Sequence, residues 1–180
     1  MSLLQTLNSI VEISKIQEGL SVLNNKQFSI NELLGTLHVW VDMEVLKKNK
    51  SIRVVYLNNM AKGEDIIEAD YDKTHNILTN LLLNSINFTQ KGKIEIGCDV
   101  FGEYFNFYVS DTGCGISEEK QKWLFTDFLN NSVTVTNIGE GSGLGLYLSS
   151  GLAKLMGGEL WLEKTSGEGT IFRLRLPRKV

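Results

Sequence analysis

Apolar residues recur at intervals of three and four along several stretches of the chain, a spacing that is typical of amphipathic helices. Residues 3–17 carry the first such stripe, which consists of Leu3, Leu4, Leu7, Ile10 and Val11. A second stripe, through residues 33–45, follows Ser29 and Asn31, either of which can cap a helix. Further helices are predicted over residues 72–87, 117–128 and 143–156.

Other stretches are short, apolar and bounded by turn residues, which predicts strands. These strands cover residues 27–30, 51–57, 65–68, 93–100, 104–110, 159–164 and 170–176. The sequence YFNFYVS of residues 104–110 is almost entirely apolar, so we expect this strand to be buried on both faces. The sum is an α/β two-layer sandwich: a mixed sheet of about five strands, plus a short edge hairpin, packed on three helices.

Composition and charge narrow the class of partner. The 180 residues can bury one sizeable core, and 42% hydrophobic with 22% charged residues is ordinary globular usage. With 18 Lys plus Arg against 21 Asp plus Glu, the net charge of −3 favours neither nucleic acid nor an anionic membrane as a partner. Cys98 and Cys114 lie in no spacing typical of zinc or redox sites, which fits a reducing, cytoplasmic location.

Three asparagines form the first candidate for chemistry. Asn76, Asn80 and Asn84 recur every four residues and therefore share one face of the helix predicted over residues 72–87. Asparagine is a poor residue for a helix interior, and such breaks of a local rule concentrate at functional sites. Its amide oxygen suits Mg²⁺ that takes its other ligands from phosphates. A polar helix edge with satisfied amides is the alternative interpretation.

A carboxylate and two groups of glycines form the second candidate. Asp111 ends the strand over residues 104–110 and is followed by Gly113 and Gly115, where a flat ring such as adenine could approach the backbone. A simple turn is the alternative interpretation. Residues 139–146, GEGSGLGL, open directly into a predicted helix, whose N-terminus favours phosphate. Residues 130–142 show no periodicity, so we expect a mobile loop there, of a length typical of a functional lid or of disorder.

These motifs, in this order, resemble the N box, first glycine box, F box and second glycine box of sensor histidine kinases, members of the GHKL ATPase superfamily. The matching segments are Asn80–Asn84, Asp111–Gly115, Phe125–Phe128 and Gly141–Leu146. Residues 157–177 resemble the terminal hairpin of that family. Residues 14–19, SKIQEG, resemble the exit of its second dimerisation and phosphoacceptor helix. The resemblance implies a Bergerat-type fold with that truncated helix in residues 1–20 and a catalytic and ATP-binding domain in residues 21–180.

The resemblance also implies roles for individual residues. Asn84 would hold Mg²⁺ against the phosphates with Asn80 beside it, and Asp111 would accept the adenine amine. Other residues would contact the nucleotide or shape the lid that covers it: Gly113, Gly115, Phe125, Phe128, Gly141, Gly143, Leu144, Gly145 and Thr170. ATP-hydrolysing members of the superfamily carry a Glu base where this chain has Asn80, which favours transfer to an external acceptor.

The implied function is transfer of the ATP γ-phosphate to a histidine on a phosphoacceptor domain absent from this chain. The implied partners are that domain, a response regulator receiver domain and a second copy of the full-length protein. The resemblance leaves open whether that protein is anchored in a membrane. Neither His38 nor His75 lies in an acceptor motif, so the chain alone is not expected to autophosphorylate. The alternatives are an anti-sigma-factor-type serine kinase and a nucleotide-sensing module without transfer activity.

The chain departs from the family in its basic residues. The family commonly has Lys or Arg three positions after the second N-box asparagine, where this chain has Asn87. Residues 129–145, in the lid, contain no Lys or Arg either. Lys73 and Lys91 are candidates to compensate, although a solvated surface position is the favoured interpretation for both.

Overall fold

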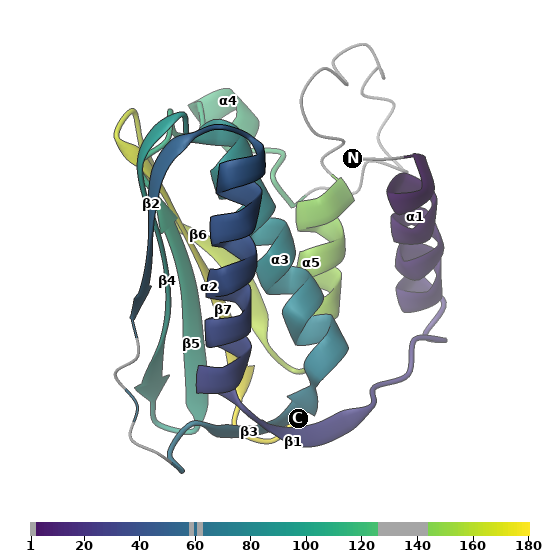
Figure 1. Cartoon of the computed structure of the whole chain (residues 1–180). Helices are drawn as coiled ribbons and strands as arrows, with labels where there is room; N and C mark the ends of the chain where they lie inside the picture. Colours follow the sequence, from purple (N-terminus) through teal and green to yellow (C-terminus); the bar gives the residue numbers. More distant parts are fainter. Residues whose placement is uncertain (1–2, 58–59, 61–62, 126–143) are drawn as a thin grey trace.

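The computed structural model describes residues 3–57, 60, 63–125 and 144–180. Its elements follow the predicted order closely (Figure 1). The helices are α1 (Leu3–Gln17), α2 (Ile30–Lys47), α3 (Tyr71–Phe88), α4 (Glu118–Gln121) and α5 (Leu144–Leu155). The strands are β1 (Asn25–Ser29), β2 (Ser51–Leu57), β3 (Ile66–Asp70), β4 (Lys91–Phe101), β5 (Tyr104–Asp111), β6 (Glu159–Ser166) and β7 (Gly169–Pro177). None of the described helices is long and apolar enough to cross a membrane.

The main sheet is mixed and has the strand order β2-β4-β5-β7-β6. β2 runs parallel to β4, and every other neighbouring pair is antiparallel. The additional pair is a separate antiparallel sheet of β1 and β3. Because α2 and β2 lie between them in the chain, these two strands are not a hairpin. The predicted α/β two-layer sandwich with a five-stranded mixed sheet is confirmed.

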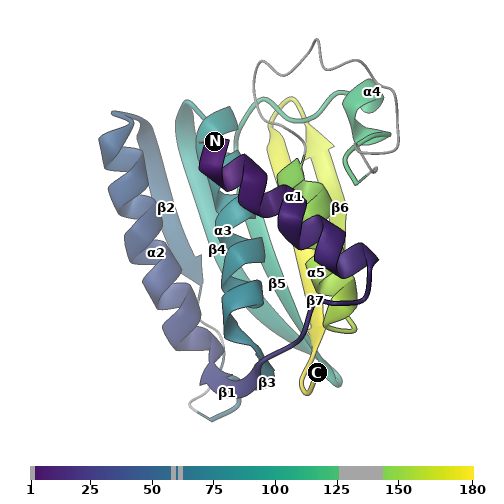
Figure 2. The same cartoon turned by 90° about the vertical axis from the view of Figure 1, so that its right-hand side faces the viewer.

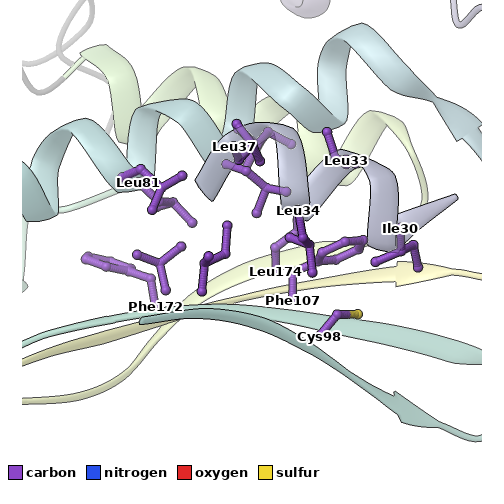
Figure 3. Packing of buried hydrophobic residues seen from close by; sticks show 14 of the residues in the cluster. Ile30, Leu33, Leu34, Leu37, Leu81, Cys98, Phe107, Phe172 and Leu174 are labelled. Carbon is purple, nitrogen blue, oxygen red and sulfur yellow. The ribbon is translucent and has the colours of Figure 1, made fainter. Parts of the chain in front are cut away.

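α2, α3 and α5 cover one face of the sheet, and α1 lies across the outer side of α5 (Figures 1 and 2). The core lies between the helices and the sheet. Leu34 of α2 lies next to Phe107 and Leu174 of the sheet there (Figure 3), and these three residues are 0% exposed. The core anchors α3, whose C-terminal half bears Asn80 and Asn84, against the strand that ends at Asp111.

The prediction that strand 104–110 is buried on both faces is wrong. Phe105, Phe107 and Val109 face the helices and are buried, whereas Tyr104 on the other face is 40% exposed. No described helix or strand packs on that face, and arginines of β7 lie against its aromatic rings instead. The Arg173 guanidinium lies 5.3 Å from the Tyr108 ring centroid, a cation–π contact that tolerates solvent.

The helix predicted over residues 117–128 is also wrong in its length. α4 ends at Gln121, and residues 122–125 form turns. Ser117 caps α4 by accepting a hydrogen bond from the Lys120 N–H, but the sequence EEKQ that follows contains no apolar residue to hold a longer helix against the core. Residues 126–128, and the loop predicted over residues 130–142, lie outside the described residues.

Candidate functional site

α3 begins at a buried carboxylate cap and presents its asparagines beside α5. The Asp70 carboxylate accepts a hydrogen bond from the Lys73 N–H at 3.0 Å, which fixes the first turn. The apolar stripe of α3 faces the core, so the asparagine face is turned to its edge. Asn80 and Asn84 are half-buried there, whereas Asn76 is exposed. The structure therefore brings two of the three asparagines to the candidate site.

Asn80 joins α3 to the beginning of α5. Its amide nitrogen donates to Ser149 Oγ at 3.0 Å, and its amide oxygen lies directly against Gly145. A Cβ at position 145 would overlap that oxygen, so the two helices can approach this closely only because residue 145 is glycine. Asn80 thus sets the position of the helix that follows the predicted lid.

Asp111 is a buried carboxylate at the end of β5, with a side chain that is 9% exposed. It accepts hydrogen bonds of 2.9 Å from Ser85 Oγ and from the Gly113 N–H, and a further bond from the Thr170 backbone. Burial nevertheless raises the pKa of Asp111, because desolvation outweighs these three donors. A charge that costs this much to bury, with no cation bonded to it among the described residues, is typical of a functional site.

The two glycines after Asp111 let the chain pass through a narrow space. A Cβ at Gly113 would lie 2.7 Å from the Phe88 carbonyl oxygen. Gly115 has φ +71° and lies against the carbonyl oxygen of Ser166, where a side chain would overlap. Both glycines are therefore required where the loop passes close to the backbone of α3 and of β6, next to the buried carboxylate.

The same loop is fastened to the hairpin of β6 and β7. The Ile116 N–H donates to Thr165 Oγ1 at 2.9 Å, and this hydroxyl lies 3.2 Å from that of Thr170. Thr170 is buried and pairs with Asp111 across β5 and β7. The predicted site residues Asp111, Gly113, Gly115 and Thr170 thus lie in one cluster.

The flanks of the predicted lid are described on both sides. Phe125 is half-buried, with its ring centroid 6.4 Å from that of Phe172 in an edge-on contact. Leu144 is buried at the first position of α5, so its side chain belongs to the interior, and its backbone alone is suited to face a phosphate. Phe128, Gly141 and Gly143 lie outside the described residues.

Neither lysine proposed to compensate for the missing basic residues reaches the asparagines. The Lys73 ammonium lies 3.6 Å from Asp70 and 3.8 Å from Glu12, at the N-terminal end of α3. Eleven residues of helix, about 16 Å, separate it from Asn84. Lys91 is exposed at the start of β4, opposite Ser51 of β2.

Three hydroxyls at the site escaped the sequence analysis. Ser85 falls within the apolar stripe of its helix, yet it donates a hydrogen bond to Asp111. Ser149 and Thr165 stand in unremarkable positions of α5 and β6. Only for Ser85 was there a signal, since a hydroxyl inside an apolar stripe needs a buried acceptor.

Residues 69–180 match the family model described as histidine kinase-, DNA gyrase B-, and HSP90-like ATPase. The circadian input-output histidine kinase CikA of Synechococcus elongatus is 33% identical over 179 residues, which cover 98% of this chain and 23% of that protein. The catalytic domain of histidine kinase ThkA is 26% identical with a TM-score of 0.67, covering 87% of this chain and 97% of that domain.

Two larger solved structures share the fold at 23% identity. Full-length ShkA in complex with AMPPNP has a TM-score of 0.80, covering 97% of this chain and 35% of ShkA. ThkA in complex with the response regulator protein TrrA has a TM-score of 0.71, covering 97% of this chain and 48% of the matched chain. This chain spans only 7% to 24% of the first three curated relatives.

Proposed function

We propose, because this chain belongs to the family of histidine kinase-, DNA gyrase B- and HSP90-like ATPases, that it binds ATP with Mg²⁺ and phosphorylates a histidine of a separate phosphoacceptor domain. It is a catalytic ATPase domain of the sensor histidine kinase type. The histidine acceptor, the partners, the transfer activity and a cytoplasmic location of this domain are all proposed.

The buried carboxylate of Asp111 carries the proposal. A carboxylate offers about four lone-pair sites, and the described residues supply three donors, from Ser85, Gly113 and Thr170. One acceptor site therefore remains beside Gly113 and Gly115, which carry no Cβ. The exocyclic amine of adenine fits this site, because it donates a hydrogen bond and its flat ring needs an approach that no Cβ blocks.

The asparagine face fits a magnesium-bound triphosphate. The amide oxygen of Asn84 is a hard neutral ligand, suited to Mg²⁺ that keeps several waters and takes phosphate oxygens. Bound Mg²⁺ would neutralise part of the phosphate charge. The N–H groups in the first turn of α5 favour phosphate as well, and Asn80 holds that helix in place through Ser149.

Asn80 argues for transfer rather than hydrolysis. Its amide has no basic oxygen with which to remove a proton from water, and its nitrogen is already bonded to Ser149. The described residues of this site therefore bind and orient ATP, while the acceptor histidine supplies the nucleophile. Phosphoryl transfer requires mainly such positioning and charge neutralisation from the protein.

The domain boundaries and partners complete the proposal. We assign residues 1–20 to the end of the second helix of a dimerisation and phosphoacceptor domain, and residues 21–180 to the catalytic domain. α1 packs on α5, where Ile13 is 2% exposed, and Glu12 of α1 lies 3.8 Å from Lys73 of α3. A homodimeric parent protein and a response regulator are the expected partners, and the ThkA–TrrA complex supports the second.

A transfer experiment tests the proposal. The chain is incubated with γ-labelled ATP, Mg²⁺ and a separately supplied phosphoacceptor domain, with Asp111→Asn as the control. Label on the acceptor that is acid-labile and base-stable is expected, and it should disappear with the control. Acid-stable label would support the serine kinase alternative, and nucleotide binding without label would support the sensing module.

A further inference from the structure

Two lysines from the segment after α2 reach the C-terminal end of α3. Lys50 donates from its ammonium to the carbonyl oxygens of Ile86, Asn87 and Thr89, at 2.5, 3.0 and 2.8 Å. Lys48 donates to the side-chain oxygen of Asn87 at 2.6 Å. α3 has no basic residue in its own last turn. The positive charge at this end of the helix therefore comes entirely from a neighbouring segment.

The two ammonium groups differ in what they contact. Lys50 is occupied by three main-chain oxygens that α3 would otherwise leave without partners, so it acts as a helix cap. Burial, and to a lesser degree the neighbouring charge of Lys48, lower the pKa of Lys50. Lys48 instead contacts one exposed side chain and is itself exposed. Its charge is accessible to a ligand, whereas that of Lys50 is not.

Asn87 places the Lys48 ammonium on the asparagine face. Asn80 and Asn87 are seven residues apart, nearly two full turns, and so point in almost the same direction from α3. Asn84 lies between them, about 4.5 Å along the helix axis from Asn87. A phosphate chain held near Asn84 is therefore within a short swing of the flexible lysine side chain. α3 itself contributes no Lys or Arg after Lys73.

We infer that Lys48 is a phosphate-binding residue, which supplies from the end of α2 the cation that α3 lacks beside its asparagine face. The inference rests on the proposed function. The ammonium exchanges its hydrogen bond with Asn87 for one with a phosphate oxygen of the bound nucleotide, and no covalent step is involved. Lys48 should contribute to the affinity for the triphosphate and not to that for the nucleoside.

The test compares two neighbouring lysines and two ligands. Lys48→Ala is measured against Lys47→Ala, which removes the same charge one residue earlier from a side chain paired with Glu44 at 2.6 Å. Calorimetric titration with AMPPNP and Mg²⁺, and separately with adenosine, is carried out on the whole chain. Lys48→Ala should weaken AMPPNP binding about five- to tenfold and leave adenosine binding unchanged, while Lys47→Ala changes neither.

A relocated charge gives the second arm of the test. Adding Asn87→Lys to Lys48→Ala places an ammonium on α3 itself and should restore most of the AMPPNP affinity, whereas Asn87→Ala in the same background should not. Equal AMPPNP affinities of Lys48→Ala and the parent would overturn the inference while the proposed function stands. A parent chain that binds adenosine and AMPPNP not at all would overturn both.

Discussion

Asp70 and Asp111 occupy similar positions and have opposite electrostatic characters. Each is a buried aspartate at the end of a strand, Asp70 ending β3 and Asp111 ending β5. Burial alone would raise the pKa of Asp70, but the N–H groups of Asn24 and Lys73 and the Lys73 ammonium together lower it. The pKa of Asp111 is raised, because desolvation outweighs its hydrogen bonds.

The difference shows how the chain separates stability from function. At Asp70 the charge is matched by a cation and a helix N-terminus, so burial contributes to the fold. At Asp111 hydrogen bonds hold the carboxylate in place without neutralising it. A site prepared for a ligand donor has this character, since the ligand supplies what the protein leaves out.

Exchanging the Asp111 carboxylate for an amide should have the strongest consequence. Asp111→Asn should weaken ATP binding about 100-fold, because a buried charge-assisted hydrogen bond to the adenine amine is lost. Its free energy of unfolding should stay equal or rise, since a costly buried charge is removed. Calorimetric titration and urea unfolding measure the two quantities. An ATP affinity equal to that of the parent would refute the assignment of Asp111.

Asn84→Ala should remove most of the Mg²⁺ dependence of nucleotide binding. We expect the parent to bind ATP about tenfold more tightly with Mg²⁺ than with chelator, and the variant to show a ratio close to one. Asn76→Ala is the matched control, because Asn76 lies on the same helix and is exposed. A variant that keeps the parental ratio would rule out Asn84 as a metal ligand.

Asp70→Asn should reverse the pattern of Asp111→Asn, with a loss of about 1–2 kcal/mol in stability and little change in ATP affinity. The pKa of Asp70 is lowered by folding, so its stabilisation is fully present above the unfolded value of about 3.8 and is lost as pH falls below it. Urea unfolding is measured from about pH 6, above this pKa, to about pH 3, below it. The free energies of unfolding of parent and variant should therefore converge as the pH falls. A constant difference across that range would contradict the assignment.

Of the variants that should weaken ATP binding, Ser85→Ala should do so the least. Removing one donor from Asp111 should weaken ATP binding about fivefold. It should also raise the pKa of Asp111 further, because less hydrogen bonding opposes desolvation. The pH below which ATP binding declines should shift upward in titrations repeated across the acid range. A loss of affinity without this shift would indicate a purely structural role for Ser85.

The candidate residues whose place in the fold was predicted from the sequence share one property: their positions follow from the residues next to them in the chain. Asp111 ends a strong apolar strand and precedes two glycines, and the structure places it at the end of β5 beside Thr170. Asn80 and Asn84 follow from helical spacing. Ser85, Ser149 and Lys48 were missed, because each acts on a residue that is distant in the chain.

The errors in the fold have the same origin. The apolar strand over residues 104–110 was predicted to be buried on both faces, but the described helices all cover one face of the sheet and arginines lie on the other. The predicted helix from Ser117 has a good cap, but its charged first turn holds no apolar residue, and Leu124 and Phe125 pack against the core from turns instead. In both cases the deciding contacts come from other elements.

The order of helices and strands, the α/β class and the carboxylate, glycine and asparagine motifs could all be read from the amino-acid sequence, because propensity, periodicity and capping act within a few residues. The pairing of distant polar groups could not: Ser85 with Asp111, Asn80 with Ser149, and Lys48 with Asn87. Hydrogen bonding and desolvation depend on neighbours in space, and these are set by how α3 packs between α2, α5 and the sheet.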